Sequence, residues 1–134
     1  MYLESHETQT TQDLAILRAT RTHALLVGPA SAVDAALAKL QSALRQPVVA
    51  WTPADALELP VLTTGTLLVR NLADLGGEQQ RRLLDWVGHG HQGVQVISTS
   101  GGHVWPLVER GAFLTTLYYR LGVVCVDLTD ASAV

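Results

Sequence analysis

Short apolar stretches alternate along the chain with stretches in which apolar residues recur at helical spacing. Five of the short stretches predict strands, because each is a brief apolar run bounded by glycine, proline or polar residues. They cover residues 23–27, 48–51, 66–69, 94–99 and 123–127. Strands that are apolar at nearly every position are buried on both faces, which is typical of a parallel sheet with helices on each side. The pattern therefore predicts an α/β fold, a three-layer sandwich around a five-stranded parallel sheet.

Helical periodicity is clearest over residues 31–45, where apolar positions follow one another at spacings of three and four. Ser31 is expected to cap the N-terminus of this helix. Asp34 is expected in its first turn, where the helix dipole favours a carboxylate. Shorter helices are predicted over residues 11–20, 78–87, 103–110 and 114–121.

Composition and charge narrow the class of protein. The chain has 134 residues, the size of one domain, and only 16% of them are charged, below the ~25% typical of soluble proteins. We predict a core domain over residues 11–129, between a flexible, polar N-terminal tail over residues 1–10 and a C-terminal tail over residues 130–134. The formal net charge of −3 provides no basic surface for nucleic acid.

Three further features indicate a cytoplasmic protein without membrane contact. No apolar run approaches the ~18 residues of a membrane span. The polar start of the chain does not resemble a signal peptide. A single cysteine, Cys125, excludes a disulfide within the chain, and it lies in a predicted buried strand.

Several other candidate sites are better explained by structural roles. His89 and His91 form an H-x-H pattern in a glycine turn, to which His103 could be added, but zinc needs at least three ligands, so we predict no metal. Residues 98–100 end a strand without the G-x-S-x-G pattern of a nucleophile elbow. The tryptophans are expected to be packing residues; they are Trp51, Trp86 and Trp105.

Three blocks of sequence match the pattern of one protein family, and they follow one another along the chain as they do in that family. Residues 108–128 read VERGAFLTTLYYRLGVVCVDL, residues 65–72 read GTLLVRNL, and residues 94–101 read VQVISTSG. These blocks resemble G-x-F-R-x-D-L-Y-Y-R-L-N-V-V-x-I-x-L, G-T-L-F-L-D-E-I and V-R-V-I-A-A-T-N in the AAA+ domain of sigma-54-dependent transcription activators. The resemblance covers residues 12–128 and implies a parallel sheet with the strand order 5-1-4-3-2.

The residues that bind and hydrolyse ATP in that family are not matched. Residues 28–35 read GPASAVDA where a phosphate loop reads G-x-x-x-x-G-K-[ST], so Val33 stands at the second glycine and Asp34 at the lysine. Arg70 and Asn71 stand where the family has its magnesium-binding aspartate and its glutamate. We therefore predict a pseudo-ATPase with no cofactor. Its degenerate nucleotide pocket would consist of Gly28, Ser31, Asp34, Arg70 and Asn71.

The two charges that replace the family's lysine and aspartate are opposite in sign. Because the resemblance implies that these two positions lie close across the pocket, Arg70 is expected to pair with Asp34. An arginine at the mouth of a parallel strand is partly desolvated and needs such a partner.

The resemblance also places Tyr118, Tyr119 and Arg120 near a subunit interface, and these residue types dominate binding hot spots. The family's sigma-54-contacting loop, helical lid and DNA-reading helix have no counterpart in the sequence. The favoured hypothesis is a non-catalytic bacterial module that acts in transcription regulation by contacting a protein partner or a second copy. Two alternatives are an ATP-binding regulator with an altered phosphate loop and a small-ligand sensor that uses the pocket around Arg70.

Overall fold

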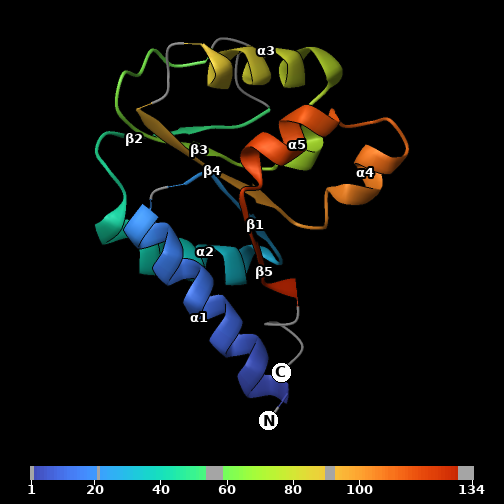
Figure 1. The fold of residues 1–134 in the computed structure, drawn as a ribbon. Helices are drawn as coiled ribbons and strands as arrows, with labels where there is room; N and C mark the ends of the chain where they lie inside the picture. Colours follow the sequence, from blue (N-terminus) through green and yellow to red (C-terminus); the bar gives the residue numbers. More distant parts are fainter. Residues whose placement is uncertain (1, 21, 54–58, 90–92, 130–134) are drawn as a thin grey trace.

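The computed structural model describes residues 2–20, 22–53, 59–89 and 93–129, in which a five-stranded parallel sheet lies between two layers of helices (Figure 1). All neighbouring strands are parallel, and their order across the sheet is β2-β3-β4-β1-β5. The predicted sandwich and the predicted strand order are both confirmed. The strands are β1 (Ala24–Val27), β2 (Val48–Trp51), β3 (Gly65–Val69), β4 (Val94–Ser100) and β5 (Val124–Asp127).

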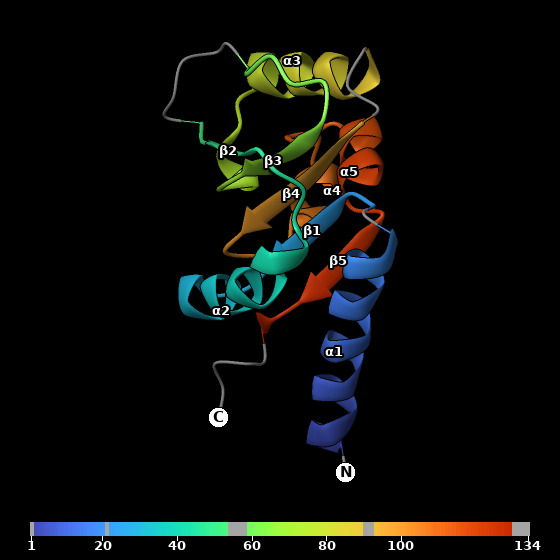
Figure 2. The same cartoon turned by 90° about the vertical axis from the view of Figure 1, so that its left-hand side faces the viewer.

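The helices cover both faces of the sheet. α1 (Tyr2–Thr20) and α2 (Ala30–Leu40) lie on one face, and α3 (Gly77–Gly88), α4 (Trp105–Glu109) and α5 (Thr115–Leu121) lie on the other (Figures 1 and 2). Two short 3-10 helices, η1 (Gln41–Ala43) and η2 (Leu72–Asp74), follow α2 and β3. Within the part of the chain that the structure describes, no helix combines the length and the apolar character that crossing a bilayer requires.

Successive residues of the central strands point to opposite faces and contribute to two separate cores. In β1, Leu25 and Val27 face α3, α4 and α5, whereas Ala24 and Leu26 face α1 and α2. The larger core, on the first of these faces, includes Val69, Leu83, Val96, Leu117 and Leu121. The smaller core includes Leu14, Leu17, Val33, Leu40 and Ile97.

The N-terminal segment is helical, because α1 begins at Tyr2 and runs without a break to Thr20, nine residues earlier than the helix predicted over residues 11–20 begins. The helix is attached to the sheet through Leu14 and Leu17, and its first turns extend away from the sheet (Figure 2). Once a helix has begun, each further residue adds one hydrogen bond at little cost, so a segment without an apolar stripe can still be helical. The proposed division into tails and core stays a prediction, and residues 130–134 lie outside the described residues.

The prediction that every strand is buried on both faces is wrong for the two edge strands. β1, β3 and β4 are buried along their whole length, but β2 and β5 each have one neighbouring strand and are only partly covered. Cys125 in β5 is exposed, as is Val48 in β2. An apolar run fits a central strand and an edge strand equally well, so the sequence pattern did not separate the two positions.

The start of α2 also differs from the prediction. The helix begins at Ala30, Pro29 occupies the N-cap position, and no side chain caps the helix. Ser31 is therefore the second helical residue, and Asp34 is the fifth, beyond the first turn. Pro29 precedes the first helical residue with an extended ψ of 151°, and its carbonyl accepts the Val33 N–H at 3.0 Å, which closes the first turn from Ala30.

A buried glutamine joins the helices of the larger layer. Gln80 of α3 is 2% exposed, and its Nε2 donates hydrogen bonds to the carbonyls of Leu75 at 2.9 Å and Ala112 at 3.0 Å. Its Oε1 accepts a hydrogen bond from the Leu114 N–H at 2.8 Å. One side chain thus provides hydrogen-bond partners both for the backbone just before α3 and for the segment that connects α4 to α5.

Replacing Gln80 with leucine should destabilise the fold strongly. Gln80→Leu keeps the approximate volume but removes the partner of the buried Leu75 contact and of the half-buried Ala112 and Leu114 contacts, and each group left buried and unpaired costs about 1–3 kcal/mol. We expect a loss of at least about 2 kcal/mol in the free energy of unfolding, measured by urea denaturation. Gln41→Leu, at an exposed position of η1, is the matched control. Equal unfolding midpoints for the two variants would contradict the role of Gln80.

A histidine ring ties the start of β1 to β4. The Nδ1 atom of His23 accepts a hydrogen bond from the Val96 N–H at 3.0 Å, so the neutral ring carries its proton on Nε2. The pKa of His23 is lowered from 6.5, first by burial and then by the positive charge of Arg120. A proton on Nδ1 would face the Val96 N–H and break this bond.

The stability of the fold should therefore decrease in mild acid. Below about pH 6.5 the unfolded chain binds a proton at His23 that the folded chain binds only at lower pH, so the free energy of unfolding falls as the pH decreases through this window. His23→Asn retains an acceptor near the Nδ1 position and removes the titrating ring. We would measure the urea midpoints of both proteins between about pH 7.5 and 5. As the pH decreases, the midpoint of the unaltered protein should fall more steeply than that of the variant. Parallel curves would show that His23 does not contribute.

Candidate functional site

The carboxyl ends of the strands bring most of the predicted site residues to one edge of the sheet. Gly28 follows β1, Arg70 and Asn71 follow β3, and residues 100–103 end β4 and continue beyond it. Ligands of parallel α/β proteins bind at this edge. The geometry at each position decides what the edge can hold.

At the end of β1, the backbone is packed too closely to admit a side chain. The Gly28 N–H donates to the Ser100 carbonyl at 2.9 Å, and the Leu128 N–H donates to the Val27 carbonyl at 2.6 Å. A Cβ atom on Gly28 would lie 2.8 Å from the Cβ of Leu128. Glycine is thus required here by the approach of β5, and Gly28 and Pro29 alone connect β1 to α2.

The predicted pairing of Arg70 with Asp34 is confirmed. The Arg70 Nη1 donates to the Asp34 Oδ1 at 3.3 Å and joins the end of β3 to α2. The two side chains are 40% and 61% exposed, so the pair contributes at most about 1 kcal/mol to stability. Ser31 lies exposed on the first turn of α2.

Asn71 has a backbone role at the turn after β3. Its φ of 58° lies in the left-handed region, which asparagine tolerates better than most residues. Its N–H donates to the Thr99 hydroxyl at 3.3 Å, and its carbonyl accepts the Asp74 N–H at 2.9 Å, which begins η2. These contacts shape the turn, and the residue as a whole is exposed.

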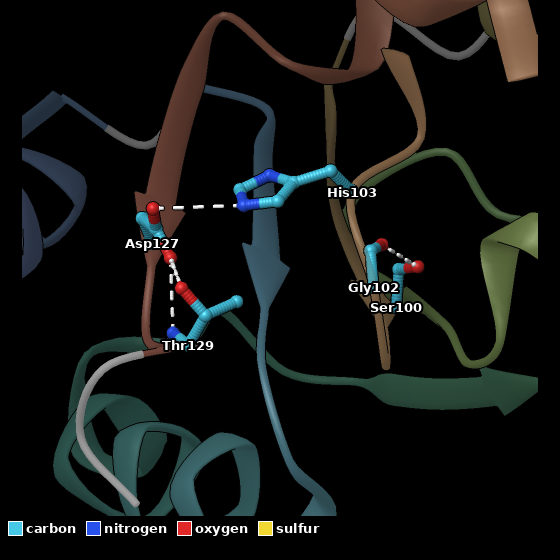
Figure 3. A network of polar contacts seen from close by, with 5 residues as sticks. All are labelled: Ser100, Gly102, His103, Asp127 and Thr129. Atoms are coloured by element: carbon cyan, nitrogen blue, oxygen red, sulfur yellow. Dashed lines mark hydrogen bonds and ion pairs between the residues drawn. The ribbon is translucent and has the colours of Figure 1, made fainter. Parts of the chain in front are cut away.

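A histidine beyond β4 reaches across β1 to β5 (Figure 3). The Nε2 of His103 lies 3.7 Å from the Oδ2 of Asp127, whose Oδ1 accepts the Thr129 N–H at 2.9 Å and the Thr129 hydroxyl. Ser100 donates its hydroxyl hydrogen to the Gly102 carbonyl, so this hydrogen is not directed at the imidazole. The arrangement links two strand ends across β1.

No metal centre is formed by the described residues, among which no group of three or more histidine, cysteine or acidic residues could hold an ion. His103 pairs with Asp127, and His89 lies 3.0 Å from the Asp85 carboxylate. His91, the other half of the H-x-H pattern, lies outside the described residues.

Three aromatic rings form a cluster on the outer side of α4 and α5. The ring of Trp105 lies 5.4 Å from that of Tyr118 and 6.2 Å from that of Tyr119, and the two tyrosine rings are 5.4 Å apart. Trp105 is 40% exposed and Tyr119 61% exposed, whereas Leu117 and Leu121 cover the sheet. We call Trp105, Tyr118 and Tyr119 the aromatic surface.

Arg120 is exposed and lies at the end of α3. A Cβ atom on Gly88 would lie 3.5 Å from its Nη1, which places the guanidinium at the C-terminal end of that helix. The negative end of the helix dipole favours a cation at this point. Arg120 is thus close to the aromatic surface in sequence but directed toward α3.

The sequence interpretation missed three of these features. Trp105 was expected to be a packing residue, yet it belongs to the aromatic surface with Tyr118. The contact between His103 and Asp127 and the three bonds of Gln80 join residues far apart in the chain, for which no local spacing is a signal.

Comparison with known proteins gives one family. The family model described as "Sigma-54 interaction domain" matches residues 5–131, which is nearly the whole chain. A search among curated proteins finds no match.

Solved structures share the fold at low sequence identity. The P-loop NTPase domain of the sigma-54 transport activator from E. coli has a TM-score of 0.73 at 21% identity, over 92% of this chain and 96% of that chain. NtrX from Brucella abortus in complex with ATP has a TM-score of 0.69 at 22% identity, over 91% of this chain but only 35% of NtrX. A RuvB variant from Thermotoga maritima has a TM-score of 0.61 at 14% identity, over 93% of this chain and 44% of that chain. The present chain therefore corresponds to about a third of NtrX.

Proposed function

The chain belongs to the sigma-54 interaction domain family, and on that premise we propose that it is a cytoplasmic, non-catalytic member that regulates transcription by contacting protein. The observation that carries this proposal is the start of α2. Residues 30–34, which align with the phosphate loop of ATP-binding members, are already helical in this chain.

A phosphate loop binds ATP by turning successive backbone N–H groups toward the phosphates. In this chain the Val33 N–H donates to the Pro29 carbonyl at 3.0 Å, inside the first turn of α2. Leu128 lies against Gly28, where such a loop begins. The backbone groups needed for a phosphate cradle are thus partly committed to the helix.

The charges at this edge also argue against ATP with magnesium. A carboxylate at the position of Asp34, about 4 Å from a phosphate, would repel it by about 4 kcal/mol at an effective dielectric constant near 20. Arg70 stands where a carboxylate would hold magnesium, and it donates to Asp34. The two side chains at the positions that would bind the phosphates and the magnesium ion are thus paired with each other.

We expect no micromolar binding of ATP with Mg²⁺ in a calorimetric titration. The double variant Asp34→Lys/Arg70→Asp restores the family's charges but leaves α2 starting at Ala30, so it should also fail to bind with micromolar affinity. Binding by this variant alone would mean that charge is the obstacle and the early helix is not. A micromolar Kd for the unaltered protein would reject the proposal in favour of an ATP-binding regulator.

The aromatic surface supports the second half of the proposal, contact with protein. Tryptophan, tyrosine and arginine are the residue types most enriched in binding hot spots. Here Trp105 of α4 and Tyr119 of α5 are exposed, with ring centres 6.2 Å apart and ring planes tilted by 57°, and Arg120 follows Tyr119 in the sequence. Rings that already pack against one another lose little conformational freedom on binding, which favours their use as anchors.

Self-association through this surface is the outcome we expect. Light scattering over a range of concentrations should show the mass rising above that of one chain, and Tyr119→Ala/Arg120→Ala should weaken the association by about 30-fold if these are hot spots. Val61→Ala/Arg82→Ala removes one exposed apolar and one exposed basic side chain elsewhere and serves as control. A monomer at every concentration, together with no binding to an AAA+ domain of the same family, would remove the support for this proposal.

A further inference from the structure

A hollow of about 450 Å³ lies at the amino edge of the sheet, opposite the edge where family members bind ATP. It is bounded by the starts of β1, β3, β4 and β5. Its lining includes Thr22, His23, Arg45, Val94, Gln95 and Val123. Volumes of roughly 300–1,000 Å³ are usual for sites that hold small molecules.

The charge of the lining is one-sided. The described lining includes one arginine, Arg45, and no acidic residue. The charge of Arg120 also acts on His23, as the lowered pKa of that imidazole indicates. The Arg45 carbonyl accepts the Thr66 hydroxyl at 3.0 Å, which holds the backbone of the arginine against β3. Its guanidinium makes one long hydrogen bond, 3.3 Å from Nη1 to the Thr64 hydroxyl, and its other N–H groups have no bond to any of the described residues.

The neutral donor of the hollow, the His23 ring, is held in place by the sheet. Because the Nδ1 of His23 accepts the Val96 N–H, the proton of the neutral ring is on Nε2, for which no bond is seen among the described residues. The Thr22 carbonyl accepts the Gln95 side-chain N–H at 2.8 Å, which fixes Thr22 beside β4. Donors that are already positioned cost little entropy when a ligand binds.

The remaining walls are small or apolar. Val94 and Val123 present methyl groups, and Gly65 and Gly93 leave bare backbone. Both glycines are required by close backbone contacts, since a Cβ on Gly93 would lie 2.6 Å from the Thr63 carbonyl oxygen and one on Gly65 would collide with that of Pro47. The hollow is therefore a consequence of how the loops pack, and side chains cannot easily fill it at these two positions.

We propose that this hollow binds a small molecule that carries an oxyanion, a carboxylate or a phosphate, with Arg45 as its charge partner and the His23 Nε2–H as a directional donor. The planar guanidinium matches either oxyanion through two parallel hydrogen bonds. The methyl groups of Val94 and Val123 would contact the uncharged part of the ligand. The site is independent of the proposed loss of ATP binding at the opposite edge.

The test is an NMR titration of the ¹⁵N-labelled chain with inorganic phosphate and, separately, with succinate, against sodium chloride at matched ionic strength. We expect shifts concentrated at Thr22, Gly65, Val94 and Gln95 that saturate with a Kd of about 1 mM or tighter. The probe that saturates at lower concentration identifies the preferred oxyanion. Shifts that do not saturate, or that chloride reproduces, would overturn the proposal.

Charge variants separate a built site from general attraction. Arg45→Gln should weaken binding by about tenfold or more, whereas Arg82→Gln, the same charge change on the exposed face of α3, should not. Val123→Glu places a carboxylate at the rim, on a residue that is 59% exposed, and should abolish binding without unfolding the chain. Unchanged urea midpoints verify that each variant is folded. Equal weakening by Arg45→Gln and Arg82→Gln would also overturn the proposal.

Discussion

The hydrogen bonds of Gln80 are the constraint on which one layer of the fold depends. α4 and α5 have 5 and 7 residues, whereas isolated helices shorter than about 12 residues are only marginally stable in water. They persist because their apolar side chains are buried and because Gln80 holds both Ala112 and Leu114 in the segment between them. The aromatic surface stands on these two helices, so its geometry is set by a side chain on a third.

The sequence was sufficient for the architecture. Apolar runs alternating with helical periodicity require a sheet covered on both faces, and the family resemblance supplied the order of the strands. One tertiary contact could also be predicted, because the exchange of charges at Asp34 and Arg70 implies attraction wherever the two positions face each other. That inference depended on the resemblance, since 36 residues separate the pair.

Other features depend on information that no local pattern contains. Whether Cys125 is buried depends on β5 having a neighbour on one side only, which is a property of the assembled sheet. The partnership of Trp105 with Tyr118 depends on the angle between two short helices. The start of α2 depends on a local competition between a proline entry and a serine cap, and the proline prevailed.

The early start of α2 has a consequence for how such a domain can change over generations. A chain that acquired a glycine at Val33 would still have a wound first turn, and one that acquired a lysine at Asp34 would lose the partner of Arg70. Neither step alone recreates a phosphate cradle, and Leu128 would still lie against Gly28. Recovery of a phosphate-binding loop therefore needs several substitutions at once. Mutation and selection are more easily expected to give this edge of the fold a new use than to restore ATP binding.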